Sequence, residues 1–227
     1  MEILIVSTSF ESLKTFISKL EIVKNLGKNY ARFRYRETEL DVLISGFGAS
    51  ASCYHLAKAF RQNQYDLVIQ LGECYSLNDN IEKDQLVCVI DDYFGDLGIG
   101  VNDEFTSIFD LNLQNKNEPP FRNEILENDI PYTELLSDFR KVSGISCNAI
   151  PTSRYRLANA YLKNYPDVIS REGAATLYAC MEEKLKLIQL FYVIDKVENV
   201  ATNYKIPEDK ADLFTHTLDT LLPELFN

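Results

Sequence analysis

Short apolar runs separated by polar stretches dominate the chain. Most runs lack the strict apolar–polar alternation of a half-exposed strand, so they predict strands that are buried on both faces. The predicted strands are Ile3–Ser7, Tyr30–Tyr35, Glu39–Ser45, Tyr65–Gln70, Gln85–Asp91, Gly144–Ala149 and Leu187–Ile194. Between them, helical spacing or small-residue starts predict helices over Ser12–Leu20, from the Gly46–Ser50 loop through Phe60, Tyr132–Phe139, Arg154–Lys163, Gly173 to about Lys186, and Pro207–Leu221.

Alternation of strands and helices predicts a three-layer α/β domain with a central mixed sheet covered on both faces. At 227 residues the chain fits one domain spanning residues 1–227. The segment Asp92–Asp110 is expected to be a long loop, and loops of this length are often binding or interface elements. The alternative is that its Phe105 and Phe109 pack in the core of the same molecule. Lys116–Asn128 carries two prolines and reads as a surface loop.

Composition narrows the classes of partner. The chain is 46% hydrophobic and 25% charged, as in ordinary soluble globular proteins. Its net charge is −11 and its pI about 4.7, which argues against nucleic acid or an anionic membrane as a partner. No apolar run approaches the ~20 residues of a membrane span, and the N-terminus reads as a buried strand, not a signal peptide.

Cysteine and histidine usage bears on redox state and metals. The five cysteines are odd in number and have no CxxC spacing, which is typical of reduced residues in a cytoplasmic protein. Only two histidines are present. We therefore expect a cytoplasmic protein with no metal site and no cofactor.

Three acids follow predicted strands: Glu11, Glu172 and Asp195. Ligands in open α/β sheets bind beyond the carboxyl ends of strands, so the three could share a site. Glu172 also precedes the small residues Gly173–Ala175 at a helix start, where backbone and ligand can approach closely. The alternative is that each acid is a helix cap or a solvated surface charge. Acids in a shared cleft suit cleavage of a glycosidic bond.

Four motifs carry a family resemblance. They are YDLVIQLG at Tyr65–Gly72, FGDLG at Phe94–Gly98, FTSIFDL at Phe105–Leu111, and YPDV at Tyr165–Val168 leading into EGAA at Glu172–Ala175. Over nearly its full length the chain resembles the purine nucleoside phosphorylase/hydrolase superfamily. Within it, the chain is most similar to futalosine hydrolases and methylthioadenosine/S-adenosylhomocysteine nucleosidases.

The resemblance implies roles for the three acids. Glu172 would hold the ribose hydroxyls, Glu11 would orient the attacking water, and Asp195 would protonate the purine at N7. A carboxyl group that donates a proton near neutral pH needs a raised pKa, so Asp195 should be substantially buried.

The resemblance also places Gly72, Arg171 and Ile150 at the substrate. Here the chain departs from the family pattern. In the predicted turn Gly72–Tyr75 only the glycine is kept, and Glu73 is expected to narrow the pocket. Arg171 stands where the family has Met, and Ile194 where it has Ser.

These features leave two readings open. The first is a hydrolase that releases the base from a small-molecule nucleoside and forms a homodimer, as family members do. Gln70 stands where phosphorylases carry a phosphate-binding Arg, which favours hydrolysis over phosphorolysis. The second reading is a degenerate, non-catalytic nucleoside-binding or interaction protein of the same fold.

Overall fold

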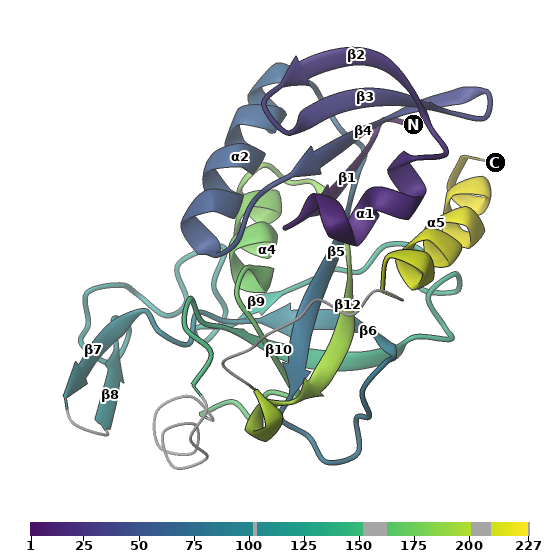
Figure 1. The fold of residues 1–227 in the computed structure, drawn as a ribbon. Coiled ribbons are helices and arrows are strands. Elements are labelled where there is room, and N and C mark those ends of the chain that lie inside the picture. The colour runs from purple at the N-terminus through teal and green to yellow at the C-terminus, as the bar shows by residue number, and fades with distance from the viewer. Residues whose placement is uncertain (102–103, 152–162, 201–209, 227) are drawn as a thin grey trace.

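In the computed structural model, residues 1–101, 104–151, 163–200 and 210–226 are described. Most of the predicted helix Arg154–Lys163 and the first residues of Pro207–Leu221 lie outside them. The helices are α1 (Phe10–Ile17), α2 (Ala49–Gln62), α4 (Gly173–Glu182) and α5 (Lys210–Phe226), with a short 3-10 helix η1 (Val197–Asn199) (Figure 1). No helix in these ranges is long and apolar enough to cross a membrane.

The strands form one large mixed sheet and a separate ribbon. The large sheet has the order β11-β10-β6-β12-β5-β1-β4-β3-β2, with β9 paired to β6. Its strands are β1 (Ile3–Ser7), β2 (Glu21–Gly27), β3 (Tyr30–Tyr35), β4 (Thr38–Ile44), β5 (Leu67–Ser76), β6 (Leu86–Asp92), β9 (Leu126–Glu127), β10 (Arg140–Ser146), β11 (Val168–Ser170) and β12 (Lys186–Lys196). The ribbon consists of β7 (Gly98–Val101) and β8 (Glu104–Ser107), and it projects from the body of the molecule (Figure 1).

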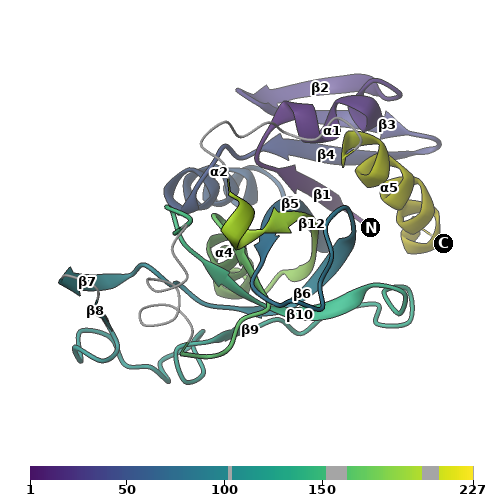
Figure 2. The ribbon, with the colours of Figure 1, turned by 60° about the horizontal axis from the view of Figure 1, so that its bottom comes forward.

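Part of the large sheet closes on itself. Strand β11 pairs with β10 in parallel and with β5 in antiparallel orientation, so β5, β12, β6, β10 and β11 form a small barrel. Figure 2 shows these strands grouped around a common interior. That interior is filled by Cys74, Val87, Val89, Val142, Val168, Phe191 and Val193. Because every barrel strand contributes an apolar side chain, closure of the sheet buries a second core beside the helix-covered one.

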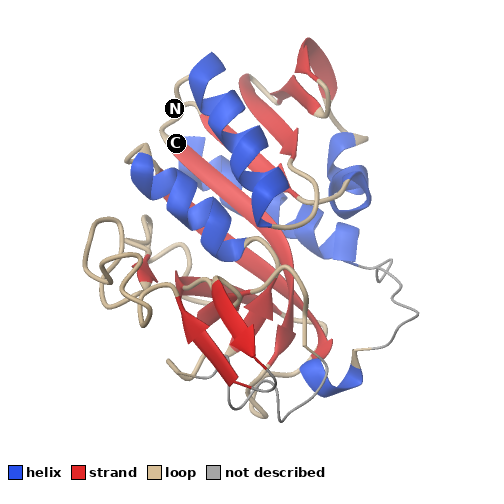
Figure 3. Ribbon diagram, turned by 90° about the vertical axis from the view of Figure 1, so that its left-hand side faces the viewer, coloured by secondary structure: helices blue, strands red, loops and turns tan. Residues whose placement is uncertain are grey.

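Helices cover both faces of the open part of the sheet. Ile3 and Ile5 of β1 point into the cluster that contains residues of α1 and α5, such as Phe16 and Phe214. Leu4 and Val6 point to the other face, toward α2 and α4. Figure 3 shows the helices on both sides of the strands. The period of two along β1 explains why its sequence is continuously apolar.

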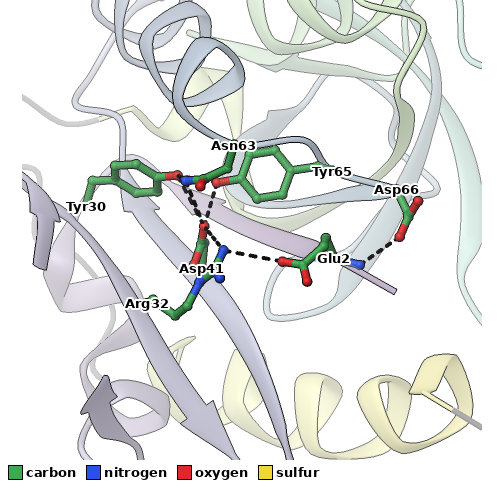
Figure 4. A network of polar contacts seen from close by, with 7 residues as sticks. All are labelled: Glu2, Tyr30, Arg32, Asp41, Asn63, Tyr65 and Asp66. Atoms are coloured by element: carbon green, nitrogen blue, oxygen red, sulfur yellow. Dashed lines mark hydrogen bonds and ion pairs between the residues drawn. The ribbon is translucent and has the colours of Figure 1, made fainter. Parts of the chain in front are cut away.

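A buried polar network anchors the β3–β4 hairpin at the other end of β5. The Asp41 carboxylate is buried and accepts hydrogen bonds from Arg32 Nε at 2.7 Å and from the Tyr65 hydroxyl at 2.7 Å. The Tyr30 hydroxyl and Asn63 Nδ2 also donate to it, at 3.2 and 3.4 Å (Figure 4). The Asp41 carboxylate, whose charge Arg32 compensates, therefore links β3 and β4 to the end of α2 and to the residues before β5.

The α/β class and the mixed sheet are confirmed, and β1 has the predicted bounds. The three-layer arrangement stays a prediction. Several predicted elements are wrong. Residues 132–139 form turns and not a helix, and β10 begins at Arg140 and ends at Ser146. Strand β2 was missed because all but its last two residues are exposed, so it carries no burial pattern.

Two corrections concern segments of functional interest. The predicted turn Gly72–Tyr75 is part of β5, because pairing with β12 continues past Gly72 to Ser76. The predicted loop Asp92–Asp110 contains the β7–β8 ribbon. Within it Phe109 is buried and packs on Phe121, with ring centroids 5.1 Å apart, so this ring belongs to the molecule's own core.

Candidate active site

Glu172 lies at the N-terminus of α4 without capping it. It occupies the N-cap position, yet its side chain makes no capping hydrogen bond. Instead the Ser170 hydroxyl accepts the N–H of Gly173 at 3.1 Å, and the Ser146 hydroxyl accepts the N–H of Ala174 at 2.8 Å. Because serines at the ends of β11 and β10 accept the first two helix N–H groups, the Glu172 carboxyl group does not take part in capping the helix.

The Glu172 carboxyl group is buried, with the residue 3% exposed. Burial raises its pKa to about 8, and the negative charge of Glu73 raises it as well. The positive charge of Arg171 acts in the opposite direction. Burial therefore favours the protonated form of Glu172, and a positive charge placed beside it would favour the ionised form.

A buried ion pair acts electrostatically on Glu172. Glu73 of β5 and Lys210, the first residue of α5, are 5% and 0% exposed, and the Lys210 ammonium donates to Glu73 Oε1. The Ser12 hydroxyl is 3.5 Å from the same oxygen. Strand β1 stops at Ser7, which pairs with Leu71, while β5 runs five residues further. Glu73 therefore lies just beyond the end of β1.

Asp195 and Arg171 meet at Tyr75. Asp195 of β12 is paired with Tyr75 of β5 in the sheet register, and the positive charge of Arg171 lowers the Tyr75 pKa against the raising effect of burial. Asp195 Oδ1 accepts the N–H of Lys196 and Asn199 Nδ2, both at 2.7 Å. Asp195 is half-buried, less than the sequence argument required, because it lies at the strand end where η1 begins.

Glu11 lies at the rim of this cluster. Its side chain is 58% exposed and pairs with Lys14 at 3.1 Å in the first turns of α1. The buried residue of this turn is Ser12. The charge of Glu11 still reaches Lys210, whose pKa it raises against the lowering effect of burial.

Gly72 and Ile150 have packing contacts in the structure. A Cβ atom at Gly72 would lie 2.5 Å from the Phe191 ring, so the glycine lets that ring fill the barrel. Ile150 packs against the cluster that contains Tyr75 and Tyr93. Contact of either residue with a ligand stays a prediction.

Asp92 was not predicted from the sequence. It binds the hydroxyl of Ser146, the same serine that accepts the N–H of Ala174 at the start of α4. It is 1% exposed, and the Ser146 hydroxyl lies 3.1 and 3.0 Å from its two carboxylate oxygens. Burial raises the pKa of Asp92 to about 8, and its charge raises the pKa of Glu172. The signal was an acid at the end of the apolar run Leu86–Ile90. Glu73 carried a similar signal, as a lone charge within a continuously buried strand.

The structure thus brings the predicted acids to one end of β5. The charge of Glu73 acts on Glu172, the charges of Glu172 and Glu11 act on Lys210, and Asp195 is paired with Tyr75 in the sheet. The cluster combines a carboxyl group of raised pKa with a charge-compensated carboxylate. That pairing of unlike carboxyl groups can serve acid–base chemistry on a polar ligand.

Comparison with known proteins identifies the fold. No family model and no curated protein matches the chain. Among solved structures, a futalosine hydrolase mutant of Helicobacter pylori has a TM-score of 0.79 at 14% identity and covers 99% of both chains. Campylobacter jejuni 5′-methylthioadenosine/S-adenosyl homocysteine nucleosidase has a TM-score of 0.80 at 14% identity, with 99% of this chain and 98% of that chain covered. The S-adenosylhomocysteine nucleosidase of Streptococcus pyogenes has a TM-score of 0.76 at 14% identity, covering 99% and 97%. The chain therefore has the fold of futalosine hydrolase and methylthioadenosine/S-adenosylhomocysteine nucleosidase, which confirms the sequence resemblance at the level of the fold.

Proposed function

We propose that the protein is a purine nucleoside N-glycosidase that hydrolyses the bond between base and ribose, with a futalosine-like nucleoside as its substrate. The observation that carries the proposal is that Glu172 is buried at the N-terminus of α4 and makes no capping hydrogen bond. The charge of Glu73 acts on its carboxyl group. A site of this kind can stabilise the oxocarbenium-like sugar through which such bonds break. Nucleosidases of the same fold add support.

In this proposal each acid has one task. Glu172 holds the ribose hydroxyls, and it becomes a better partner as the sugar gains positive charge, because a nearby cation favours its ionised form. Asp195 protonates the leaving purine. A further carboxylate orients the attacking water, and Glu11 is the residue that the sequence suggests for it. Gly72, Arg171 and Ile150 are proposed to lie at the substrate.

Water, and not phosphate, is the proposed acceptor. Gln70, at the position where phosphorylases carry an arginine, is buried and accepts a hydrogen bond from Gln189 Nε2 at 2.8 Å. Gln189 Nε2 also donates to the Gly173 carbonyl at 3.0 Å. A neutral amide pair at this place offers no charge to a phosphate dianion.

We also propose a cytoplasmic homodimer. All five cysteines are free thiols, and four are buried. In the β7–β8 ribbon, Ile99 and Val101 are 53% and 60% exposed on a two-stranded element that lies away from the body. Isolated two-stranded ribbons are marginally stable in water, so a second subunit is the proposed cover for these side chains.

The second candidate is a nucleoside-binding protein without catalysis. The exposed Glu11 and the half-buried Asp195 favour it, since both fall short of the burial expected of catalytic groups. The deciding experiment incubates the protein with futalosine, methylthioadenosine, adenosine and inosine, and measures base release with Glu172→Gln as the control. Base release that the control loses supports the hydrolase. Binding with a measurable affinity but no release supports the binding protein.

A further inference from the structure

We propose that Glu73, held by Lys210, is the carboxylate that orients and deprotonates the attacking water, in place of Glu11. This inference rests on the proposed hydrolase function and assigns one of its tasks to a different residue. It also reverses the expectation that Glu73 merely narrows the pocket.

The position of Glu73 in the sheet favours this role. Glu73 lies beyond the last pair of β1 and β5, where β1 ends and the first turn of α1 begins. Its Oε1 atom is 3.5 Å from the Ser12 hydroxyl in that turn. It is also close enough to Glu172, the proposed ribose ligand, for its charge to raise the Glu172 pKa. Glu73 thus brings a carboxylate to the same corner of the site for which Glu11 was expected.

The charge of Glu73 is compensated inside the protein. A buried carboxylate is costly unless a cation compensates it, and the ammonium group of Lys210 does so. Burial raises the pKa of Glu172 to about 8 and so favours its protonated form. Two carboxyl groups in unlike surroundings, one paired with a buried cation and one whose charged form burial disfavours, are the arrangement that separates a base from other roles.

The two Glu–Lys pairs near the site differ in how far their side chains are exposed. Glu11 and Lys14 form an exposed pair, with side chains 58% and 47% exposed. Glu73 and Lys210 form a pair with side chains 4% and 0% exposed. Near the end of β1, the hydroxyl of Ser7 is buried too, and it has no hydrogen-bond partner among the described residues. Water held between polar groups of this corner would be oriented far better than water at the exposed Glu11.

The proposed step is hydrolysis of the bond between C1′ of the ribose and the base. The oxygen of water attacks C1′ of the ribose, and one proton of the water passes to the Glu73 carboxylate. The bond from C1′ to the base nitrogen breaks, and its electron pair stays on the base, which receives the proton of Asp195. The products are ribose with a hydroxyl group at C1′ and the protonated, neutral base. Solvent returns the proton from Glu73 to Asp195.

The test compares variants of the two pairs by steady-state kinetics of base release. We expect Glu73→Gln to lower kcat by about 10²–10³-fold while KM changes less than about threefold. The loss should exceed that of Glu11→Gln at least about tenfold. Lys14→Met serves as the matched control, since it removes the exposed lysine, and it should stay within about twofold of the wild type.

A separate readout tests the role of Lys210 as a positioning residue. In Lys210→Met, the Glu73 carboxylate loses its cation, so the acidic limb of the kcat/KM profile should move to higher pH. Because Glu73→Gln leaves a buried lysine unpaired, the double variant Glu73→Gln/Lys210→Met removes both charges and preserves folding, which circular dichroism verifies.

The outcomes separate the two claims. A double variant that folds and keeps the wild-type kcat overturns the assignment of Glu73, as does a loss confined to Glu11→Gln. An unmoved pH profile in Lys210→Met overturns the role of Lys210. A wild type that releases no base from any nucleoside tested overturns the proposed function itself, before any variant is compared.

Discussion

Ile169 of β11 pairs with Tyr75 of β5 in antiparallel register. Arg171 and Glu172 follow the end of β11 directly, so the antiparallel pairing leads the chain back toward the earlier residues of β5. Glu172 therefore reaches the site because β11 runs against β5, and not because it follows a strand parallel to β1. Its place in the site thus differs in origin from that of an acid at the end of a parallel strand, which was the expectation.

Loss of the general acid should be visible in turnover. Asp195→Asn keeps the shape of the side chain and removes proton donation, so we expect kcat to fall by about 10²–10⁴-fold. Binding of the nucleoside, measured by calorimetry, should change little. Loss of binding in parallel with turnover would indicate that Asp195 stabilises the end of β12 and does not donate a proton.

Glu172→Gln should reduce kcat more than affinity. The amide cannot become negatively charged as the sugar becomes cationic, so an interaction specific to the transition state is lost. We expect a fall of about 10²-fold or more in kcat. Equal affinity of a cationic ribose analogue for the wild type and Glu172→Gln would contradict this role.

Stability should fall as the pH rises. Asp92 and Glu172 have folded pKa values of about 8, against about 4 in an unfolded chain. Between those values the folded state binds more protons than the unfolded state, so the free energy of unfolding is highest below about pH 4 for these groups. It falls with a slope of at most about 1.4 kcal/mol per pH unit for each group.

Thermal unfolding at a series of pH values from 5 to 9 would measure this effect (on the order of several degrees in Tm). Asp92→Asn should flatten the profile, since its amide cannot ionise. A stability curve that rises with pH in both proteins would contradict the assignment.

The network around Asp41 predicts a stability effect remote from the site. Asp41→Asn removes the charge that Arg32 and two tyrosine hydroxyls contact, leaving donors unsatisfied. We expect a loss of about 2–4 kcal/mol in urea unfolding. The matched control is Glu21→Gln, which breaks the exposed pair with Arg34 at 3.5 Å and should cost less than about 0.5 kcal/mol.

The β7–β8 ribbon predicts the mode of assembly. Ile99 and Val101 lie two residues apart on one strand and so share a face. Replacing both by Glu should shift a dimer toward the monomer in light scattering after gel filtration. Leu113→Glu is the control, because Leu113 is 73% exposed outside the ribbon. A wild type that is monomeric at micromolar concentration would exclude the proposed dimer.

Sequence patterns predicted the fold well where burial is continuous. The strands β1 and β3 were predicted at their observed bounds, because runs such as Ile3–Val6 admit little else. The turn at Gly72–Tyr75 was wrong because glycine is read as a chain reversal, whereas here it makes room for the Phe191 ring inside a strand. Glu172 was identified because a conspicuous local motif surrounds it.

The partners of Glu73 were beyond sequence reasoning. Lys210 is 137 residues away in the chain and resembles any lysine at the start of a helix. Only closure of the tertiary structure shows that it is fully buried. The exposure of Glu11 was hidden for a similar reason, since a shift of one position around α1 exchanges it with the buried Ser12.

The Phe191 ring lies between two glycines, one on β5 and one at the start of α4. Cβ atoms at Gly72 and Gly173 would lie 2.5 and 3.2 Å from its atoms. The size of the residue at position 72 is therefore coupled to the size of the ring at position 191. A side chain at Gly72 would require a smaller residue in place of Phe191, whereas one at Gly173 would first collide with the Asp92 carboxylate, 2.2 Å from the added Cβ atom.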